Sequence, residues 1–152
     1  MSLQPTWSGD GDEALQAILY RFQLRFRNWR PALGDVARII YQHEQDWLDS
    51  HGGGTWAPLA PGTIRQKERE GWPHPTWTLY RSGAMYRSLT SPHGPYSIFS
   101  VQEDELRIGV DWPVAQYHHE GKGRLPQRKL IVFTPALVSR IRKVMMQHLM
   151  RG

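Results

Sequence analysis

The chain has 152 residues, of which 39% are hydrophobic, and its formal charge is +5 with a sequence pI near 9.8. This composition is typical of one globular domain, expected here over residues 1–152. Because there is no apolar run of about 18 residues and no leader with basic and apolar regions, we expect a soluble protein made in a cytosol, with no membrane partner. The chain has no cysteine, which excludes disulfides, thiolate zinc sites and cysteine nucleophiles.

The charge and the aromatic content point to partners without naming them. The basic excess comes more from arginine than from lysine and favours a polyanion, either an acidic protein face or nucleic acid. The seven tryptophans are a second signal, because this residue is enriched at the centres of protein–protein contacts. Its commonest use is nevertheless to fill a core.

The first 50 residues predict two helices. Residues 1–12 are expected to be flexible or a single edge strand, and Asp10 with Glu13 has the spacing of a capping box. From Glu13 to about Asn28 the apolar residues have the spacing of one buried helical stripe: Leu15, Ile18, Leu19, Phe22 and Phe26. Pro31 opens a second helix to about Ser50, whose stripe is Leu33, Val36, Ile40, His43 and Trp47. Their short connection predicts an antiparallel helical hairpin.

The glycine run after His51 leads into a loop that carries Trp56 and Leu59 between prolines. Prolines stiffen such a loop, so two large apolar side chains can anchor it on a core at low entropic cost. A short polar helix is predicted from Pro61 to just before Gly71, because Pro suits a first helical turn and good helix formers follow it.

The next segment predicts a helix and then a hairpin. A threonine cap, Thr76 or Thr78, would precede a helix that carries Leu79 to Leu89, with Gly83 in its middle at a cost of about 1 kcal/mol. The hydrophobic period then changes to two. Residues 96–102 and 106–110 flank an acidic turn at residues 103–105, which is typical of a β-hairpin.

The C-terminal third predicts two more helices. Val114 to Gly121 is long enough for two helical turns, and Lys129 to Phe133 is a short run of β-forming residues. Thr134 and Pro135 have the pattern of an N-cap and a first-turn proline for a last helix, whose stripe is Leu137, Ile141, Val144, Met145 and His148 or Leu149. Together these elements predict an α+β fold, with an N-terminal helical hairpin, central helices, a small antiparallel sheet and a C-terminal amphipathic helix.

Catalytic and metal-binding patterns are weak. In His118-His119-Glu120 the adjacent histidines point about 100° apart on a helix, and no third ligand has a recognisable spacing, so one packed and one solvated histidine is the favoured interpretation. His43-Glu44 with His51 does not have the spacing of the HExxH metalloprotease helix. Ser82 has no glycine two positions before it, as a nucleophile elbow requires, and the glycine run has no Gly-Lys-Thr of a phosphate loop. We therefore expect no enzyme and no cofactor.

The basic residues are distributed over several elements and fit no recognition helix, zinc finger or RNP pattern. A solvated surface is their default role, and non-specific contact with DNA is the alternative. The residues are Arg21, Arg25, Arg27, Arg30, Lys122, Arg124, Arg128, Lys129, Arg140, Arg142 and Lys143.

Five short motifs in order resemble the phage virion-morphogenesis family, which includes the tail-completion proteins (protein S type) of contractile-tailed and Mu-like phages. The tryptophan loop matches W-x-P-L with T-apolar-x-x-K behind it, and L-x-x-S-G, apolar-Gly, A-x-x-H-x-x-G and P-x-R follow over roughly residues 13–150. Two positions depart from the family pattern, Ala60 and Val114, where serine and an aromatic residue are frequent. The matching residues are Trp56, Pro58, Leu59, Thr63, Lys67, Leu79, Ser82, Gly83, Ser88, Gly109, Ala115, His118, Gly121, Pro126 and Arg128.

The resemblance implies a non-enzymatic structural protein that completes the tail and takes part in head–tail joining. It implies a ring of copies at the neck or head-proximal tail end of the virion, built in the host cytoplasm beside the tail tube or tail terminator and the connector proteins. We expect the hairpin edge and the Trp56 loop to form subunit contacts. Arg140, Arg142 and Lys143 would face an acidic neighbour or DNA. The alternative is a basic DNA-binding protein of a mobile element.

Overall fold

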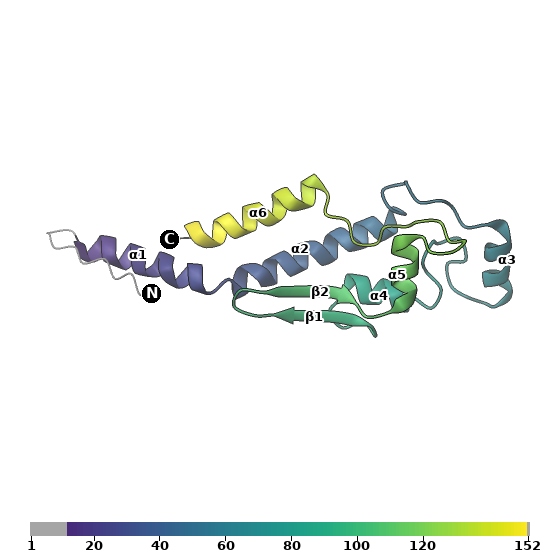
Figure 1. Cartoon of the computed structure of the whole chain (residues 1–152), viewed down its shortest axis with the longest axis horizontal. Helices are drawn as coiled ribbons and strands as arrows, with labels where there is room; N and C mark the ends of the chain where they lie inside the picture. The colour runs from purple at the N-terminus through teal and green to yellow at the C-terminus, as the bar shows by residue number, and fades with distance from the viewer. Residues whose placement is uncertain (1–11, 152) are drawn as a thin grey trace.

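The computed structural model describes residues 12–151, and its long axis follows helix α2, the longest element (Figure 1). Proline at the start of α2 fits the helix geometry, and the glycine-rich turn after Asp49 ends it. In chain order the elements are α1 (Asp12–Arg27), α2 (Arg30–Asp49), α3 (Pro61–Arg69), α4 (Ala84–Thr90), β1 (Ser97–Val101), β2 (Leu106–Val110), α5 (Pro113–Glu120) and α6 (Pro135–Met150). The expected α+β class is confirmed.

The other elements pack around α2. Helix α6 runs beside it on one side, and α4 and the β-hairpin pack on the other, while α3 lies at the far end of the molecule (Figure 1). The main core forms where the end of α2 meets α4, α5 and the segment before α6. Its buried members are Leu48, Trp56, Met85, Leu89, Ala115 and Leu130.

The β-hairpin is confirmed as an antiparallel pair with the acidic turn between its strands. Ser97 pairs with Val110 and Val101 with Leu106, so the register is continuous through five residue pairs. The turn contacts the helices directly, because the carbonyl of Glu103 accepts a hydrogen bond of 2.7 Å from the backbone N–H of Trp29. This bond fixes the hairpin to the joint between α1 and α2.

The first two helices do not form the expected antiparallel pair. Helix α1 continues away from the start of α2, and α6 returns along both of them (Figure 1). The joint is held by α6, where His148 Nε2 lies 2.9 Å from the carbonyl oxygen of Asn28 and the imidazole lies on the ring of Trp29. A short connection restricts distance along the chain but not the angle between helices, and here the angle leaves the α1 stripe exposed.

The helix expected over Leu79–Leu89 begins only at Ala84. Leu79 and Gly83 both have left-handed backbone conformations, with φ of 58° and 79°. A Cβ on Gly83 would lie 2.8 Å from the Tyr80 hydroxyl oxygen, so this position requires glycine. Gly83 precedes the helix, whereas the sequence predicted it in the middle of the helix. Leu79 to Gly83 is therefore a loop that delivers side chains to a cavity described below.

The run from Lys129 to Phe133 is not a strand. It is a loop with bends at Leu130 and Ile131 that lies along α2, and two of its carbonyl groups are bonded by side chains of that helix in place of a neighbouring strand. Trp47 Nε1 donates to the carbonyl of Lys129 at 2.8 Å, and His43 Nε2 lies 3.0 Å from that of Val132. A β-forming sequence without a partner strand thus becomes a strap over a helix.

The remaining helix boundaries follow the sequence signals. Proline opens α3, α5 and α6, and the side chain of Thr134 accepts the Leu137 N–H at 3.2 Å as the expected N-cap. In the described part of the chain, no helix is both long enough and apolar enough to cross a membrane.

Candidate functional site

Residues from four of the five motifs meet around one cavity of about 390 Å³ between the tryptophan loop, α3, the Leu79–Gly83 loop and α5. Segments far apart in the chain thus share this site. Eight of the residues identified by their motifs line it: Leu59, Thr63, Lys67, Leu79, Ser82, Gly83, His118 and Arg128.

Lys67 is a buried cation on α3, with only 7% of its surface exposed. Its ammonium group donates 2.9 Å to the carbonyl of Trp77 and 3.4 Å to that of His74. Burial lowers its pKa, and the positive charge of Arg81 lowers it further. The lysine therefore closes the loop after α3 through carbonyl groups, and none of its described hydrogen bonds is to a carboxylate.

Arg128 is the second buried cation and is 4% exposed. Its Nη2 donates 2.8 Å to the carbonyl of Ala57, which ties the P-x-R segment to the tryptophan loop. Its buried Nε has no protein partner among the described residues, and burial lowers the pKa of the guanidinium. Beside it, burial and the charge of Arg128 lower the pKa of His118, so this imidazole favours the neutral form.

An ion pair lies at the edge of the cavity. Arg81 bonds the carboxylate of Glu70 and stacks its guanidinium 5.1 Å from the centre of the Trp72 ring. Hydrogen bonds from Gln66, Trp72 and Arg81 lower the pKa of Glu70 to about 2. Because these two charges offset each other, the buried cations Lys67 and Arg128 leave the cavity with an excess of positive charge.

Four of the other motif residues, Ser88, Gly109, Ala115 and Gly121, have roles in the packing or the backbone of the fold. The Ser88 hydroxyl accepts the Tyr96 N–H at 3.0 Å and thereby joins α4 to β1, and Ala115 lies in the core. Gly121 ends α5 with a φ of 69°, where a Cβ would lie 2.9 Å from Gln127. Gly109 pairs with Ile98 in the hairpin. Pro58 and Pro126 are exposed.

Trp56 is 8% exposed and packs in the core, so a subunit contact of its loop would involve the other residues of that loop. The exposed part of its loop is Ala57 and Pro58. Among the other described tryptophans, only Trp77 is exposed, at 39%. Of the six described tryptophans, Trp56 lies in the core, and Trp47 and Trp112 pack against it. Trp7 and Asp10 lie outside the described residues.

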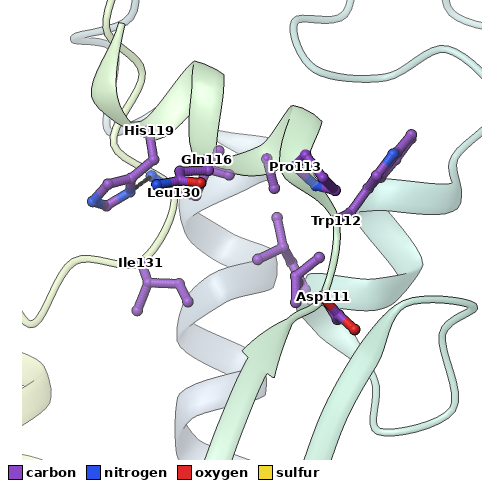
Figure 2. A pocket seen from close by; sticks show the side chains of 10 residues that line it. Asp111, Trp112, Pro113, Gln116, His119, Leu130 and Ile131 are labelled. Carbon is purple, nitrogen blue, oxygen red and sulfur yellow. Dashed lines mark hydrogen bonds between the residues drawn. The ribbon is translucent and has the colours of Figure 1, made fainter. Parts of the chain in front are cut away.

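A second, more open hollow of about 560 Å³ lies between α5, the end of β2 and the strap (Figure 2). At its edge His119 Nδ1 accepts the Leu130 N–H at 3.1 Å, which holds the strap against α5. The expectation of one packed and one solvated histidine is thus wrong, since both are half-buried and His119 is bonded. In residues 12–151 no three His, Asp or Glu side chains are grouped as a metal site would require.

Glu44 is a buried carboxylate that periodicity alone did not single out. It is 2% exposed, and neither carboxylate oxygen has a hydrogen-bond partner in the described chain. Burial raises its pKa to about 8, and the nearby backbone of Val132 opposes this shift without a full hydrogen bond. A cavity of about 70 Å³ with mainly apolar walls lies beside it. The sequence signal that could have identified Glu44 as buried is its position, four residues from both Ile40 and Leu48 on the same face of α2.

The α1 stripe is exposed, contrary to the expectation of a buried face. Leu15, Ile18, Leu19, Phe22 and Phe26 are each 43–62% exposed, although α6 contacts part of this helix. The same end of the molecule is basic. Arg140, Arg142 and Lys143 are exposed on α6, which has no carboxylate, and α1 carries Arg21, Arg25 and Arg27. We refer to α1 and α6 together as the arm.

Comparisons with known proteins give no match. The chain matches no family model, no curated protein and no solved structure.

Proposed function

We propose that this chain is a structural phage virion-morphogenesis protein that completes the tail and takes part in head–tail joining. It would act as a ring of copies at the neck or head-proximal tail end. Two features support the proposal. Eight of the motif residues line one cavity. The arm has apolar surface that is exposed to solvent in a single copy of the chain.

The exposed apolar face of α1 is the observation that carries the assembly role. An isolated helix of this length is marginal in water, and helices in proteins are stabilised mainly by packing of an apolar face. On α1 that face is about half exposed. Contiguous exposed apolar surface marks sites of protein–protein contact. The arm is therefore the main subunit contact in this proposal. The exposed hairpin residues Ile98 and Phe99 and the exposed part of the Trp56 loop would be further contacts.

The basic side chains of the arm would face an acidic neighbour in the neck. Arg140, Arg142 and Lys143 lie on one helix without compensating carboxylates, so they create a local positive field. The same gathering of charge is what favours the alternative, a DNA-binding protein of a mobile element. A duplex titration separates the two: nanomolar, sequence-specific binding at about 150 mM salt would favour the alternative, and weak binding that falls steeply with salt would not.

Self-association tests the assembly role with single substitutions. Ile18→Asp and Phe22→Asp each place a charge on the exposed apolar face, and Gln16→Glu places one on the same helix at an exposed polar position. In sedimentation velocity we expect the wild type and Gln16→Glu to form the same oligomer and the two aspartate variants to lose it. Monomers at all concentrations for the wild type would contradict self-assembly through the arm.

In the producing phage, loss of this chain is expected to leave separate heads and tails in electron micrographs. Complementation with the wild-type chain is expected to restore joined particles, whereas Phe22→Asp does not restore them. Normal joined particles without the chain would overturn the proposal.

A further inference from the structure

The cavity between the tryptophan loop, α3 and α5 has the composition of a binding site for an organic anion. Its lining includes the buried cations Lys67 and Arg128 and apolar residues such as Leu59, Leu79 and Met85. A buried charge is costly unless it is paired or hydrogen-bonded. Neither cation is bonded to a carboxylate in the described chain, and Arg128 Nε is buried without any protein partner.

Both cations retain N–H donors that their described hydrogen bonds do not use. An ammonium group has three N–H donors, and Lys67 uses two of them on carbonyl groups. A guanidinium has five, and the described hydrogen bond of the Arg128 side chain uses Nη2. Hydrogen bonds from such cations to a carboxylate are among the stronger ones in proteins, because both groups are charged.

We propose that this cavity binds a carboxylate of a partner protein, presented by an acidic side chain next to an apolar residue that fills the rest of the cavity. The positive charge of Lys67 and Arg128 and the apolar side chains beside them favour this occupant over nucleic acid. A duplex phosphate lies on a bulky hydrated backbone, which does not enter a hollow of about 390 Å³ beside apolar side chains. The identity of the partner as a neck neighbour rests on the proposed function, but the binding chemistry does not.

The test uses the full chain and a small aryl carboxylate, 3-phenylpropionate, with its neutral amide, 3-phenylpropanamide, as the matched probe. Binding is followed by NMR through the Nε–H resonance of Arg128 and the indole resonances of Trp77 and Trp112, which line the cavity. We expect saturable shifts with the acid and at least about tenfold weaker binding of the amide, because the amide loses the charge-assisted bonds.

Two variants locate the site. Val114→Trp fills the cavity from its exposed rim without changing either cation, and is expected to abolish binding in a chain that still folds. Arg142→Gln removes an exposed cation of α6 and is expected to leave binding unchanged. Arg128→Gln is expected to weaken binding of the acid but not binding of the amide. If this variant fails to fold, Val114→Trp still decides where the probe binds.

Three results would overturn the proposal. These are equal binding of acid and amide, binding that survives Val114→Trp, and preferential shifts with inorganic phosphate, which would make the cavity a phosphate site. None of these outcomes depends on particle assembly. If the acid does not bind but head–tail joining is normal, only the proposed carboxylate site is refuted. If the acid binds but the chain is absent from particles, only the virion role is refuted.

Discussion

Replacement of Glu44 by glutamine is expected to remove a fall in the free energy of unfolding that the wild type shows between about pH 5 and about pH 7.5. The side chain is 2% exposed, and burial raises its pKa from 4.5 to about 8. Below about pH 4.5 the carboxyl group is protonated in both folded and unfolded chains and contributes no difference. As the pH rises towards 8 the unfolded chain loses this proton first, so the free energy of unfolding falls.

The size of this effect follows from the shift. One pKa unit corresponds to about 1.4 kcal/mol, so the free energy of unfolding is expected to fall by roughly 3 kcal/mol between about pH 5 and about pH 7.5. Glutamine has nearly the same shape and cannot ionise. Its own unsatisfied amide lowers stability equally at both pH values, so the difference between the two measurements isolates the carboxyl group.

Urea unfolding at the two pH values measures this difference. Glu68→Gln is the matched control, because Glu68 is an exposed glutamate on α3. We expect the control to follow the wild type, including any contribution from the histidines, and Glu44→Gln to lack the fall of roughly 3 kcal/mol. Parallel changes in all three proteins would show that Glu44 ionises normally in the fold and would refute the reasoning.

Three further substitutions test the site and the arm. Lys67→Met is expected to lower the free energy of unfolding by about 2 kcal/mol, because the carbonyls of His74 and Trp77 lose their donor; equal stability with the exposed control Arg69→Met in urea would contradict this role. Gly83→Ala is expected to cost about 1–3 kcal/mol because of its positive φ and the contact with Tyr80, whereas Gly62→Ala in α3 meets no atom within 4 Å and costs nothing; similar melting temperatures for both would refute the strain. Arg142→Glu is expected to leave the melting temperature unchanged and to impair head–tail joining in a complementation assay, and normal joining would refute the basic contact.

Local signals in the sequence predicted most elements. The change of hydrophobic period located the hairpin, and the threonine–proline pair located the start of α6. These signals depend on neighbouring residues only. The spacing of the motif residues, by contrast, did not indicate that Lys67 and Arg128 would line the same cavity.

The errors have a common origin in tertiary contacts. The start of α4 was misplaced because a left-handed conformation at Leu79 and Gly83 is not encoded by propensity. The run from Lys129 to Phe133 has β-forming residues but no strand, because its hydrogen-bond partner is a helix and not a sheet. The stripe predicted for α2 includes His43 and Trp47, whereas the buried face includes Glu44 and Leu48, one position further round. The sequence did not predict this face because a carboxylate is expected to face water.

The proposed role requires that this chain is a structural part of the virion. Quantitative mass spectrometry of gradient-purified particles measures its copy number directly, relative to the portal and the tail-tube protein. We expect a constant small number of copies, as a ring at the neck or tail end requires. Complete absence from joined particles would contradict the claim, and the duplex titration would then test the DNA-binding alternative.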